Sequence, residues 1–317
     1  VISARFETAV KRLFPEIVKE YLPQKLFTDR IKTEKNHIRR SRLYLPGNEP
    51  KYFINAGLHS PDGIILDLED SVHPDEKDAA AILVRNALRC VNFYGAELMV
   101  RINQMPVGLT DLKYIVPNGV QVILLPKCEN AEELNRIEME ITRLKNTHNI
   151  LEDILLMPII ESAEGVLNAQ KIAKASPNVC ALAIGLEDYT ADIGAVKTNT
   201  GNESLFARCT VINSAKAAGI QAIDSVFADI ENSDALRQSV IDARALGFEG
   251  KGCIHPAQIS IIHDAFKPSD QEIQRAIQIV NAFEKASFDG KGVIALGNKM
   301  IDPPVVKRAQ NLLRSLQ

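Results

Sequence analysis

The feature that most constrains the fold is a strict alternation of short apolar runs and helix-like patterns between residues 41 and 266. The apolar runs are continuous, as in strands that are buried on both faces of a parallel sheet. Eight strands are predicted, at residues 41–46, 63–70, 97–103, 119–127, 153–161, 179–188, 221–227 and 250–256. Eight helices are predicted after them, at residues 50–58, 76–91, 109–116, 129–145, 164–175, 204–218, 233–246 and 257–266.

This alternation implies right-handed βαβ units, and eight such units predict a closed (β/α)₈ barrel, the TIM barrel. An open, doubly wound α/β sheet is the alternative. Its first strand is usually followed by a glycine-rich nucleotide turn, and the segment LPGNEP (45–50) lacks the GxGxxG spacing. The barrel is therefore favoured.

Two flanking segments lie outside the alternation. Residues 1–40 carry ten Lys/Arg against five Asp/Glu and predict an amphipathic helix, over about residues 3–22, followed by a basic linker. Pro268 and Ser269 mark the start of another helix, which runs to about residue 287 and is followed by a last helix to residue 317. We therefore expect an N-terminal arm (1–40), a catalytic barrel (41–266) and a C-terminal helical arm (267–317).

Composition restricts the class of protein. The chain has 46% apolar and 24% charged residues and a net charge of −3, which favours a globular protein without a nucleic-acid partner. No apolar stretch is long enough to span a membrane. Five scattered cysteines favour reduced thiols in the cytoplasm. The first residues are unlike a signal peptide, and because Val1 is not an initiator methionine a processed N-terminus stays open.

Ionisable residues gather at the carboxyl ends of the predicted strands, where a (β/α)₈ barrel builds its active site. They are Asp67, Glu69, Asp70, Arg101, Lys127, Glu161, Glu187, Asp188 and His255. Each one alone has a structural interpretation, such as a helix cap or an ion pair. Together, however, the acids would raise one another's pKa unless a cation lay among them. Arg101 with Lys127, a metal ion, or both would supply that charge.

Glu161 ends the apolar run ILLMPII (154–160), where the loss of hydration of a carboxylate is costly. Asp188 lies at the end of the next predicted strand. Two oxygen donors that leave most of the coordination sphere to water and substrate suit Mg²⁺ or Mn²⁺. We therefore predict that a divalent cation balances Glu161.

Eight segments add a further signal. They are RRSRLYLPGNEPKYF (39–53), GIILDLEDSV (63–72), VRIN (100–103), LLPKCEN (124–130), IIESAEG (159–165), AIGLEDYTADIG (183–194), GFEGKGCIHPAQI (247–259) and GNKMIDPPVVKRAQ (297–310). In this order they resemble the citrate lyase β-subunit family, which includes malyl-CoA and citramalyl-CoA lyases within the HpcH/HpaI aldolase superfamily. The resemblance covers residues 39–313 and also implies the barrel.

The resemblance implies roles for single residues. Glu161 and Asp188 match the Mg²⁺ ligands of the family, and Arg101 matches the arginine that faces the substrate carbonyl and carboxylate. Glu69 and Asp70 match acids that hold metal-bound water.

Further roles concern the substrate and a neighbouring subunit. The backbone N–H groups of Leu186 and Glu187 would receive the keto-acid carboxylate, and Asp302 matches an aspartate that the C-terminal arm delivers to a neighbour's active site. A region resembling the contact surface for CoA or a carrier arm contains Arg42, Asn48 and Lys51.

The implied activity is a Mg²⁺-dependent carbon–carbon lyase that cleaves or forms a citryl, malyl or citramalyl thioester of CoA or a carrier protein, giving an acyl thioester and a 2-keto acid. A homo-oligomer, either trimer or hexamer, is implied, and acyl-carrier and transferase subunits are candidate partners. The segment ISARFETAVKRLFPE (2–16) is similar to the end of the acyl-carrier subunit, although a plain amphipathic helix explains it equally well. A thioester hydrolase on the same scaffold and a non-catalytic acyl-carrier-binding subunit are the alternatives.

Overall fold

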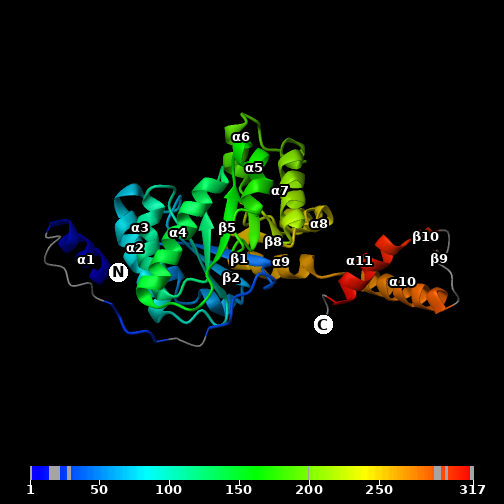
Figure 1. The fold of residues 1–317 in the computed structure, drawn as a ribbon, viewed down its shortest axis with the longest axis horizontal. Helices are drawn as coiled ribbons and strands as arrows, with labels where there is room; N and C mark the ends of the chain where they lie inside the picture. Colours follow the sequence, from blue (N-terminus) through cyan, green and yellow to red (C-terminus); the bar gives the residue numbers. More distant parts are fainter. Residues whose placement is uncertain are drawn as a thin grey trace. The chain divides into compact units, whose positions relative to one another are not determined.

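The computed structural model describes residues 2–13, 22–26, 30–198, 200–288, 294–296 and 299–314, and Figure 1 shows its ribbon. The chain divides into two compact units, Val1–Asp264 and Ala265–Gln317. Each unit has its own architecture.

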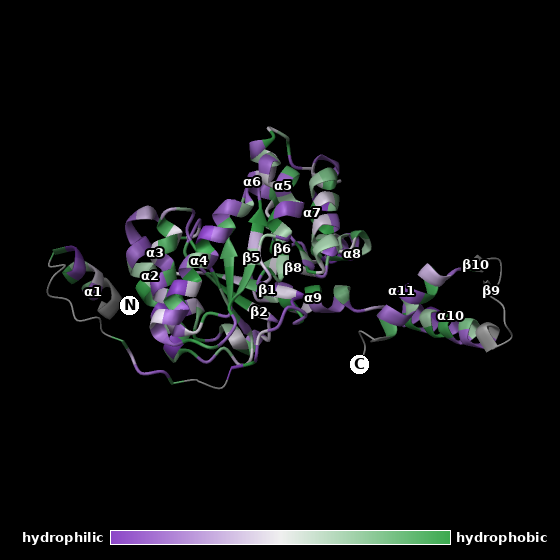
Figure 2. Ribbon diagram, in the orientation of Figure 1, coloured by the Kyte–Doolittle hydropathy of each residue, from purple (hydrophilic) through white to green (hydrophobic). Residues whose placement is uncertain are grey.

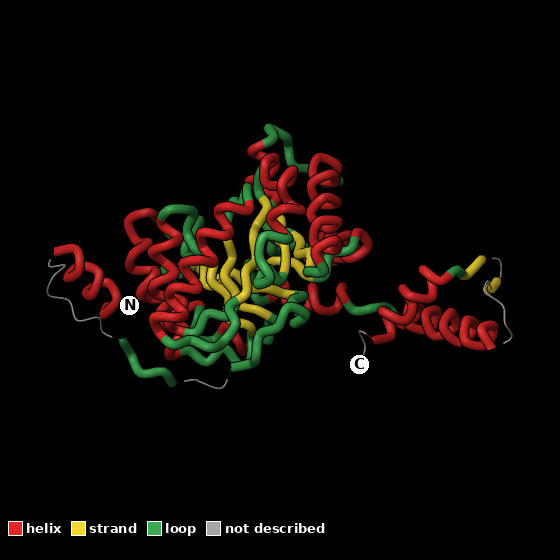
Figure 3. Tube along the Cα trace, in the orientation of Figure 1, coloured by secondary structure: helices red, strands yellow, loops and turns green. Residues whose placement is uncertain are grey.

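The first unit is built around a closed barrel of eight parallel strands, paired in the order of the chain (Figure 3). The last strand closes onto the first, with Ser41 in register with Lys251. The barrel confirms the fold predicted from the alternation. Its strands are β1 (Ser41–Pro46), β2 (Gly63–Asp67), β3 (Glu97–Arg101), β4 (Val122–Leu125), β5 (Leu155–Ile160), β6 (Ala181–Ile184), β7 (Gln221–Asp224) and β8 (Gly250–Cys253).

Helices follow the strands and surround the barrel. They are α2 (Lys77–Cys90), α3 (Val107–Ile115), α4 (Ala131–His148), α5 (Ala163–Ala173), α7 (Leu205–Ala218), α8 (Ser233–Leu246) and α9 (Ala257–Phe266). Side chains at their N-caps fix several of the starts: Asn130 accepts a hydrogen bond from Glu133 N–H, and Ser162 accepts one from Gly165 N–H.

Two elements differ from the prediction. The helix expected over 50–58 is replaced by two short 3₁₀ helices, Pro50–Tyr52 and Ala56–His59. Gly57 there lies against the backbone of Phe93, a close approach that leaves no room for a Cβ. The strand expected over 179–188 ends at Ile184, and the short helix α6 (Leu186–Asp192) begins after Gly185.

Much of the barrel interior is apolar, and Figure 2 shows several of its strands in the colour of hydrophobic residues. A buried cluster joins branched and methionine side chains of β2 to β7, among them Ile65, Met99, Val122, Met157 and Ile159. On β6 the cluster contains only small side chains, Ala181 and Ala183. Ala183 also lines the cavity described below.

Outside the barrel, the first unit contains α1 (Ile2–Leu13), which lies on α2. Glu7 of α1 pairs with the buried Arg85 of α2 at 3.1 Å. The helix predicted over about 3–22 is described only to Leu13, because residues 14–21 lie outside the described residues.

The second unit is a small helical hairpin. Its elements are α10 (Asp270–Phe288), the antiparallel strands β9 (Ile294–Leu296) and β10 (Lys299–Ile301), and α11 (Pro303–Arg314). It has its own apolar core, which includes Ala276, Ile279, Ile301, Val306 and Ala309. In the parts of the chain that the structure describes, no helix is both long enough and apolar enough to cross a membrane.

Candidate active site

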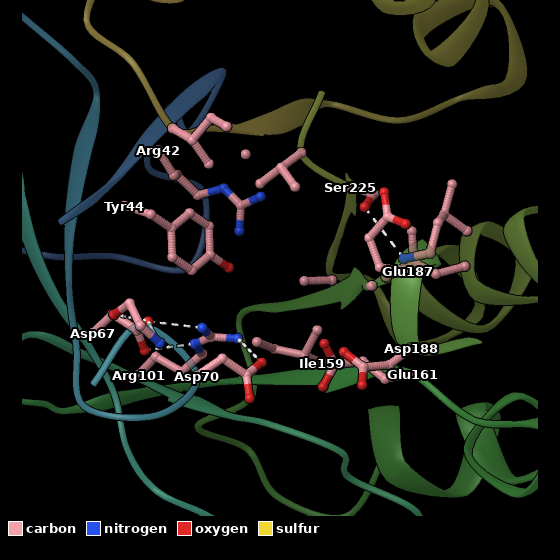
Figure 4. A pocket seen from close by; sticks show the side chains of 18 of the residues that line it. Arg42, Tyr44, Asp67, Asp70, Arg101, Ile159, Glu161, Glu187, Asp188 and Ser225 are labelled. Carbon is pink, nitrogen blue, oxygen red and sulfur yellow. Dashed lines mark hydrogen bonds and ion pairs between the residues drawn. The ribbon is translucent and has the colours of Figure 1, made fainter. Parts of the chain in front are cut away.

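A cavity of about 440 Å³ lies inside the barrel and extends to the carboxyl ends of its strands (Figure 4). Residues from seven strands, or from the loops directly after them, line it; β4 supplies none of the lining residues. The cavity brings together several of the residues predicted for the site: Arg42, Asp70, Arg101, Glu161, Leu186, Glu187 and Asp188.

Glu161 follows β5 and is 6% exposed. Its Oε2 accepts a hydrogen bond of 2.7 Å from Lys127 N–H, and no cationic side chain of the described residues forms an ion pair with it. Ser162, and not Glu161, caps α5. Burial raises the pKa of Glu161 to about 7, and the Asp188 carboxylate adds to the rise. The structure therefore contains a buried carboxylate that lacks a counter-ion.

Two backbone features hold Glu161 in place. Lys127 adopts the left-handed conformation, with φ of 46°, and in this conformation its N–H points at the carboxylate. On the other side, a Cβ at Gly185 would overlap Glu161 Oε1, so only glycine leaves room for the carboxylate. The glycine at position 185 thus makes room for a side chain that follows the neighbouring strand β5.

Asp188, in the first turn of α6, lies on the same side of the cavity as Glu161 (Figure 4). Its Oδ1 is 3.1 Å from the Nζ of Lys127, and both side chains are partly exposed, at 39% and 35%. Lys127 therefore contacts both acids, Glu161 through its backbone and Asp188 through its ammonium group.

This pair of acids fits a magnesium ion by the chemistry of its donors. Both groups offer carboxylate oxygens, which Mg²⁺ prefers. Among the described residues no cationic side chain forms an ion pair with the buried one, and the charge of Arg101 lowers its pKa less than burial raises it. Among the described residues, no three Asp, Glu, His or Cys side chains form a group that could hold a metal. Glu161 and Asp188 could hold such an ion together.

Arg101 ends β3 and points into the cavity opposite these acids (Figure 4). Its Nε and Nη2 each donate a hydrogen bond of 2.7 Å to Asp67, its register partner on β2. Its Nη1 lies 3.0 Å from Glu69 and 3.4 Å from Asp70. These carboxylates hold the pKa of Arg101 above its usual value against the opposing effect of burial, and the two-point contact with Asp67 fixes its orientation.

Hydrogen bonds from Gln104 and Lys77 hold the loop after β2 that carries Glu69 and Asp70. Glu69 is buried, burial raises its pKa, and it accepts a hydrogen bond of 2.9 Å from Gln104. Lys77 Nζ donates to the backbone carbonyls of Leu68 and Glu69, at 3.1 and 2.9 Å. Asp70 is more exposed and lines the cavity.

Sequence reasoning missed two participants. Asp67 appeared only as one of several charges at strand ends, although its place at the end of the strand next to Arg101 was a signal for the pair. Tyr44 was not singled out at all. Its ring centroid lies 5.4 Å from Arg101 Cζ, and the inward-facing alternation of β1 could have identified it.

Other predicted residues lie elsewhere or have other contacts. Asn48 donates to Glu76, and the exposed Lys51 lies 3.1 Å from Glu49; neither lines the cavity, whereas Arg42 is inside the barrel. Leu186 N–H donates to the Ser225 hydroxyl at 3.2 Å (Figure 4).

Glu187 and Asp302 are the last two of the residues predicted for the site. The Glu187 side chain pairs with Lys197. Asp302 belongs to the second unit, is exposed, and caps α11 by accepting a hydrogen bond of 3.2 Å from Val305 N–H.

Comparisons with known proteins identify the family of this chain. The family model described as HpcH/HpaI aldolase/citrate lyase matches residues 40–256. Citrate lyase subunit beta of Leuconostoc mesenteroides subsp. cremoris is 38% identical over 280 residues, which are 87% of this chain and 93% of that relative. The mitochondrial citramalyl-CoA lyase of Mus musculus is 33% identical over 290 residues, 87% of this chain and 85% of that relative.

Among solved structures, CitE of Mycobacterium tuberculosis in complex with magnesium, acetoacetate and coenzyme A has a TM-score of 0.74 and 27% identity. The match covers 89% of this chain and 98% of that one. These similarities confirm the resemblance that the sequence motifs indicate.

Proposed function

Because this chain belongs to the HpcH/HpaI aldolase/citrate lyase family, as an oxo-acid lyase of the citrate lyase β type, we propose that it is a magnesium-dependent carbon–carbon lyase. It would cleave or form a 3-hydroxyacyl thioester of the citryl, malyl or citramalyl kind, with a 2-keto acid as one product. The observation that supports this most strongly is the buried carboxylate of Glu161, which has no ion-pair partner among the described residues and shares the cavity with the guanidinium of Arg101, held by Asp67.

Glu161 and Asp188 are the residues that would hold the magnesium ion. Bound there, Mg²⁺ would act as a Lewis acid toward the substrate's 3-hydroxyl and carboxylate oxygens. The magnesium in the solved structure of Mycobacterium tuberculosis CitE supports this choice of metal.

Arg101 would stabilise the negative charge on the substrate's 3-oxygen. The 3-hydroxyl would give its proton to the water bound by Glu69 and Asp70. As the bond between C2 and C3 breaks, its electron pair would stay on C2 as a thioester enolate, and the C3–O⁻ group would become the carbonyl of the keto acid. A guanidinium that Asp67 already orients loses little free energy in reorganisation as the charge develops. The backbone N–H groups of Leu186 and Glu187 would bind the keto-acid carboxylate, for which Leu186 must release Ser225.

The remaining residues belong to the same proposal. Asp302 of a neighbouring subunit would donate a proton to C2 of the enolate, or remove it in the condensing direction. Glu69 and Asp70 would bind water next to the metal, and Asn48 and Lys51 would contact the thioester arm of CoA or a carrier. This arrangement requires a homo-oligomer, which we propose is a trimer or hexamer. The five free cysteines support a reducing, cytoplasmic location.

The test is an assay of acetyl-CoA with oxaloacetate, glyoxylate or pyruvate, and of the reverse cleavages, with Mg²⁺ and with a chelator. We expect a hydroxyacyl thioester in one direction, a keto acid in the other, and no turnover without the metal. Free CoA without a keto acid would instead indicate a thioester hydrolase. Failure of every pair would favour a non-catalytic carrier-binding subunit and overturn the proposal.

A further inference from the structure

Arg42 lies in the interior of the barrel rather than near the expected thioester arm. It is the second residue of β1, in register with Gly63 on β2 and Gly252 on β8, and is 1% exposed. Figure 4 shows its guanidinium pointing into the cavity that also contains Arg101 and Glu161.

No anionic group of the described protein balances this charge. Among the described residues, the Arg42 side chain has one hydrogen bond, to the Sδ of Met157 at 3.0 Å, and its buried Nε has no partner. A thioether is a weak acceptor and does not offset the cost of burying a cation. Burial accordingly lowers the pKa of Arg42.

Two other arginines are fully buried in the described part of the chain, and each is paired with a carboxylate. Arg39 donates to Glu97 at 2.7 Å, and Arg85 pairs with Glu7 at 3.1 Å. Arg42 is the exception among these three, and it is the one that lines a cavity. An unpaired buried cation beside an open space suggests a ligand that supplies the missing anion.

The structure keeps that space open with small residues. Ala183 of β6 and Gly252 of β8 line the cavity. A Cβ at Gly252 would come within 2.7 Å of Val226 and 3.3 Å of the Tyr44 ring, so a larger residue would collide there. Figure 4 also shows the Tyr44 hydroxyl, a further hydrogen-bond donor, pointing into the cavity.

The charges of the cavity are divided along its length. The acids Glu161, Asp188 and Asp70 lie toward the carboxyl ends of the strands, whereas Arg42 comes from the start of β1. A ligand that reaches from these acids to Arg42 needs a metal-binding group near the acids and an anionic group near Arg42. A planar guanidinium binds a carboxylate best, through two parallel hydrogen bonds.

We infer that Arg42 binds a second carboxylate of the substrate, on the keto-acid half, and that the enzyme thereby selects a 2-oxo dicarboxylic acid over a 2-oxo monocarboxylic acid. The inference rests on the proposed function, which places the first carboxylate near Glu161 and Asp188. Arg42 would determine which keto acid binds, and the other residues would carry out bond cleavage.

The test compares oxaloacetate with pyruvate by titration calorimetry in the presence of Mg²⁺, with malate and lactate as stable analogues that also differ by one carboxylate. For the full-length Arg42→Met variant, the ratio of dicarboxylate to monocarboxylate affinity should fall about 30- to 100-fold relative to wild type, the value of a hydrogen-bonded charge pair. The matched control is Arg40→Met, because the Arg40 guanidinium pairs with Asp62 at 2.9 Å and does not line the cavity. The control should keep the wild-type ratio.

A second pair of measurements guards against a folding artefact. Without ligand, Arg42→Met should unfold at a temperature no lower than wild type, because it removes an unpaired buried charge. Arg42→Lys keeps the charge but not the planar fork, and should retain part of the dicarboxylate preference. An unchanged ratio in Arg42→Met, equal losses for both acids, or no binding of either acid to wild type would overturn the inference.

The outcomes also separate this inference from the proposed function. Lyase turnover without a dicarboxylate preference would reject the role of Arg42 and leave the lyase. An Arg42-dependent dicarboxylate preference in a protein that shows no turnover with any acid would reject the lyase and leave the carboxylate site.

Discussion

In this cavity, neighbouring groups orient single side chains without neutralising their charge. Glu161 is the best example, because its surroundings provide one hydrogen bond from Lys127 N–H and no counter-ion among the described residues. Burying this charge costs free energy, and a bound cation would offset that cost.

We predict that Glu161→Gln lowers Mg²⁺-dependent turnover roughly 1,000-fold, comparable to the loss of a main electrostatic catalyst. Glutamine keeps an acceptor for Lys127 N–H but loses the charge. Turnover measured against Mg²⁺ concentration checks this, with Glu164→Gln as the control, because Glu164 lies in the first turn of α5 and does not line the cavity. Wild-type metal dependence in Glu161→Gln would remove Glu161 from the site.

Lys127 allows a test of the backbone alone. Because its φ is 46°, a non-glycine residue there is strained. Lys127→Gly should therefore be more stable than Lys127→Ala by about 1 kcal/mol, although both variants lose the ammonium contact with Asp188. Urea unfolding of the two variants gives the difference directly. Equal stabilities, or a more stable alanine variant, would show that the left-handed conformation costs nothing.

At this scale the sequence indicates which residue types meet at the strand ends, but it does not reveal their partners. Glu161 and Asp188 were expected on adjacent strands, and the structure brings them to one side of the cavity. The clamp between Asp67 and Arg101 depends on strand register, and the need for Gly185 depends on the side chain of Glu161. Both are properties of the folded barrel and not of any local pattern.

At the scale of elements, a buried polar chain links α2, the end of β3 and α3. Lys77 donates to Asn103, whose backbone N–H and side-chain amide both donate to Asp111, at 2.8 and 2.9 Å. Burial raises the pKa of Asp111 from about 3.8 to about 6. This chain holds the loop that carries Glu69 and Asp70.

The raised pKa of Asp111 sets a pH dependence. Below pH 3.8 this aspartate is protonated in both the folded and the unfolded chain, so burial of its charge has no cost there. As the pH rises from about 4 to 6 the unfolded chain ionises first, and the free energy of unfolding falls by at most about 3 kcal/mol. Above pH 6 this contribution is constant.

Asp111→Asn should abolish this loss, since asparagine keeps an acceptor for Asn103 without a charge. Urea unfolding of wild type and variant between pH 4 and 7 checks the prediction, with the exposed Asp75→Asn as control. A stability difference between wild type and Asp111→Asn that stays constant over this range would contradict it.

The hydrophobic pattern predicts an element well where burial of the segment itself decides its structure. All eight strands fall within their predicted ranges, because burial on both faces selects apolar runs. The failures occur where a distant contact decides. The segment after β1 breaks into 3₁₀ turns against Phe93, and the strand before Gly185 stops beside Glu161.

At the scale of the whole molecule, the proposed role of Asp302 requires that subunits assemble into an oligomer. Asp302→Asn should remain folded, because asparagine also caps helices well, but turnover should fall about 100-fold if the carboxyl group transfers a proton. Steady-state assays with thermal unfolding as a control test both parts. Full activity would leave Asp302 only its capping contact with Val305 N–H.

Mixed oligomers test whether Asp302 acts in a neighbouring subunit. Subunits with Asp302→Asn and subunits with Glu161→Gln are each expected to be inactive alone. Refolded together, they should regain up to about a quarter of wild-type turnover, because random assembly places an intact aspartate against an intact metal site at that frequency. No recovery would mean that both residues act in the same subunit, or that the proposed oligomer does not form.

If Arg42 binds the second carboxylate, the cavity that Ala183 of β6 and Gly252 of β8 line would also limit the length of the keto acid. Arg42 lies against Met157 of the buried cluster. With its second carboxylate on Arg42, a keto acid with an extra methylene could not move further inward, and its carbonyl carbon would be displaced outward from Arg101. Such a homologue should then occupy the site as an inhibitor instead of reacting. Acids that are too long would thus be rejected at the chemical step, after they have already bound.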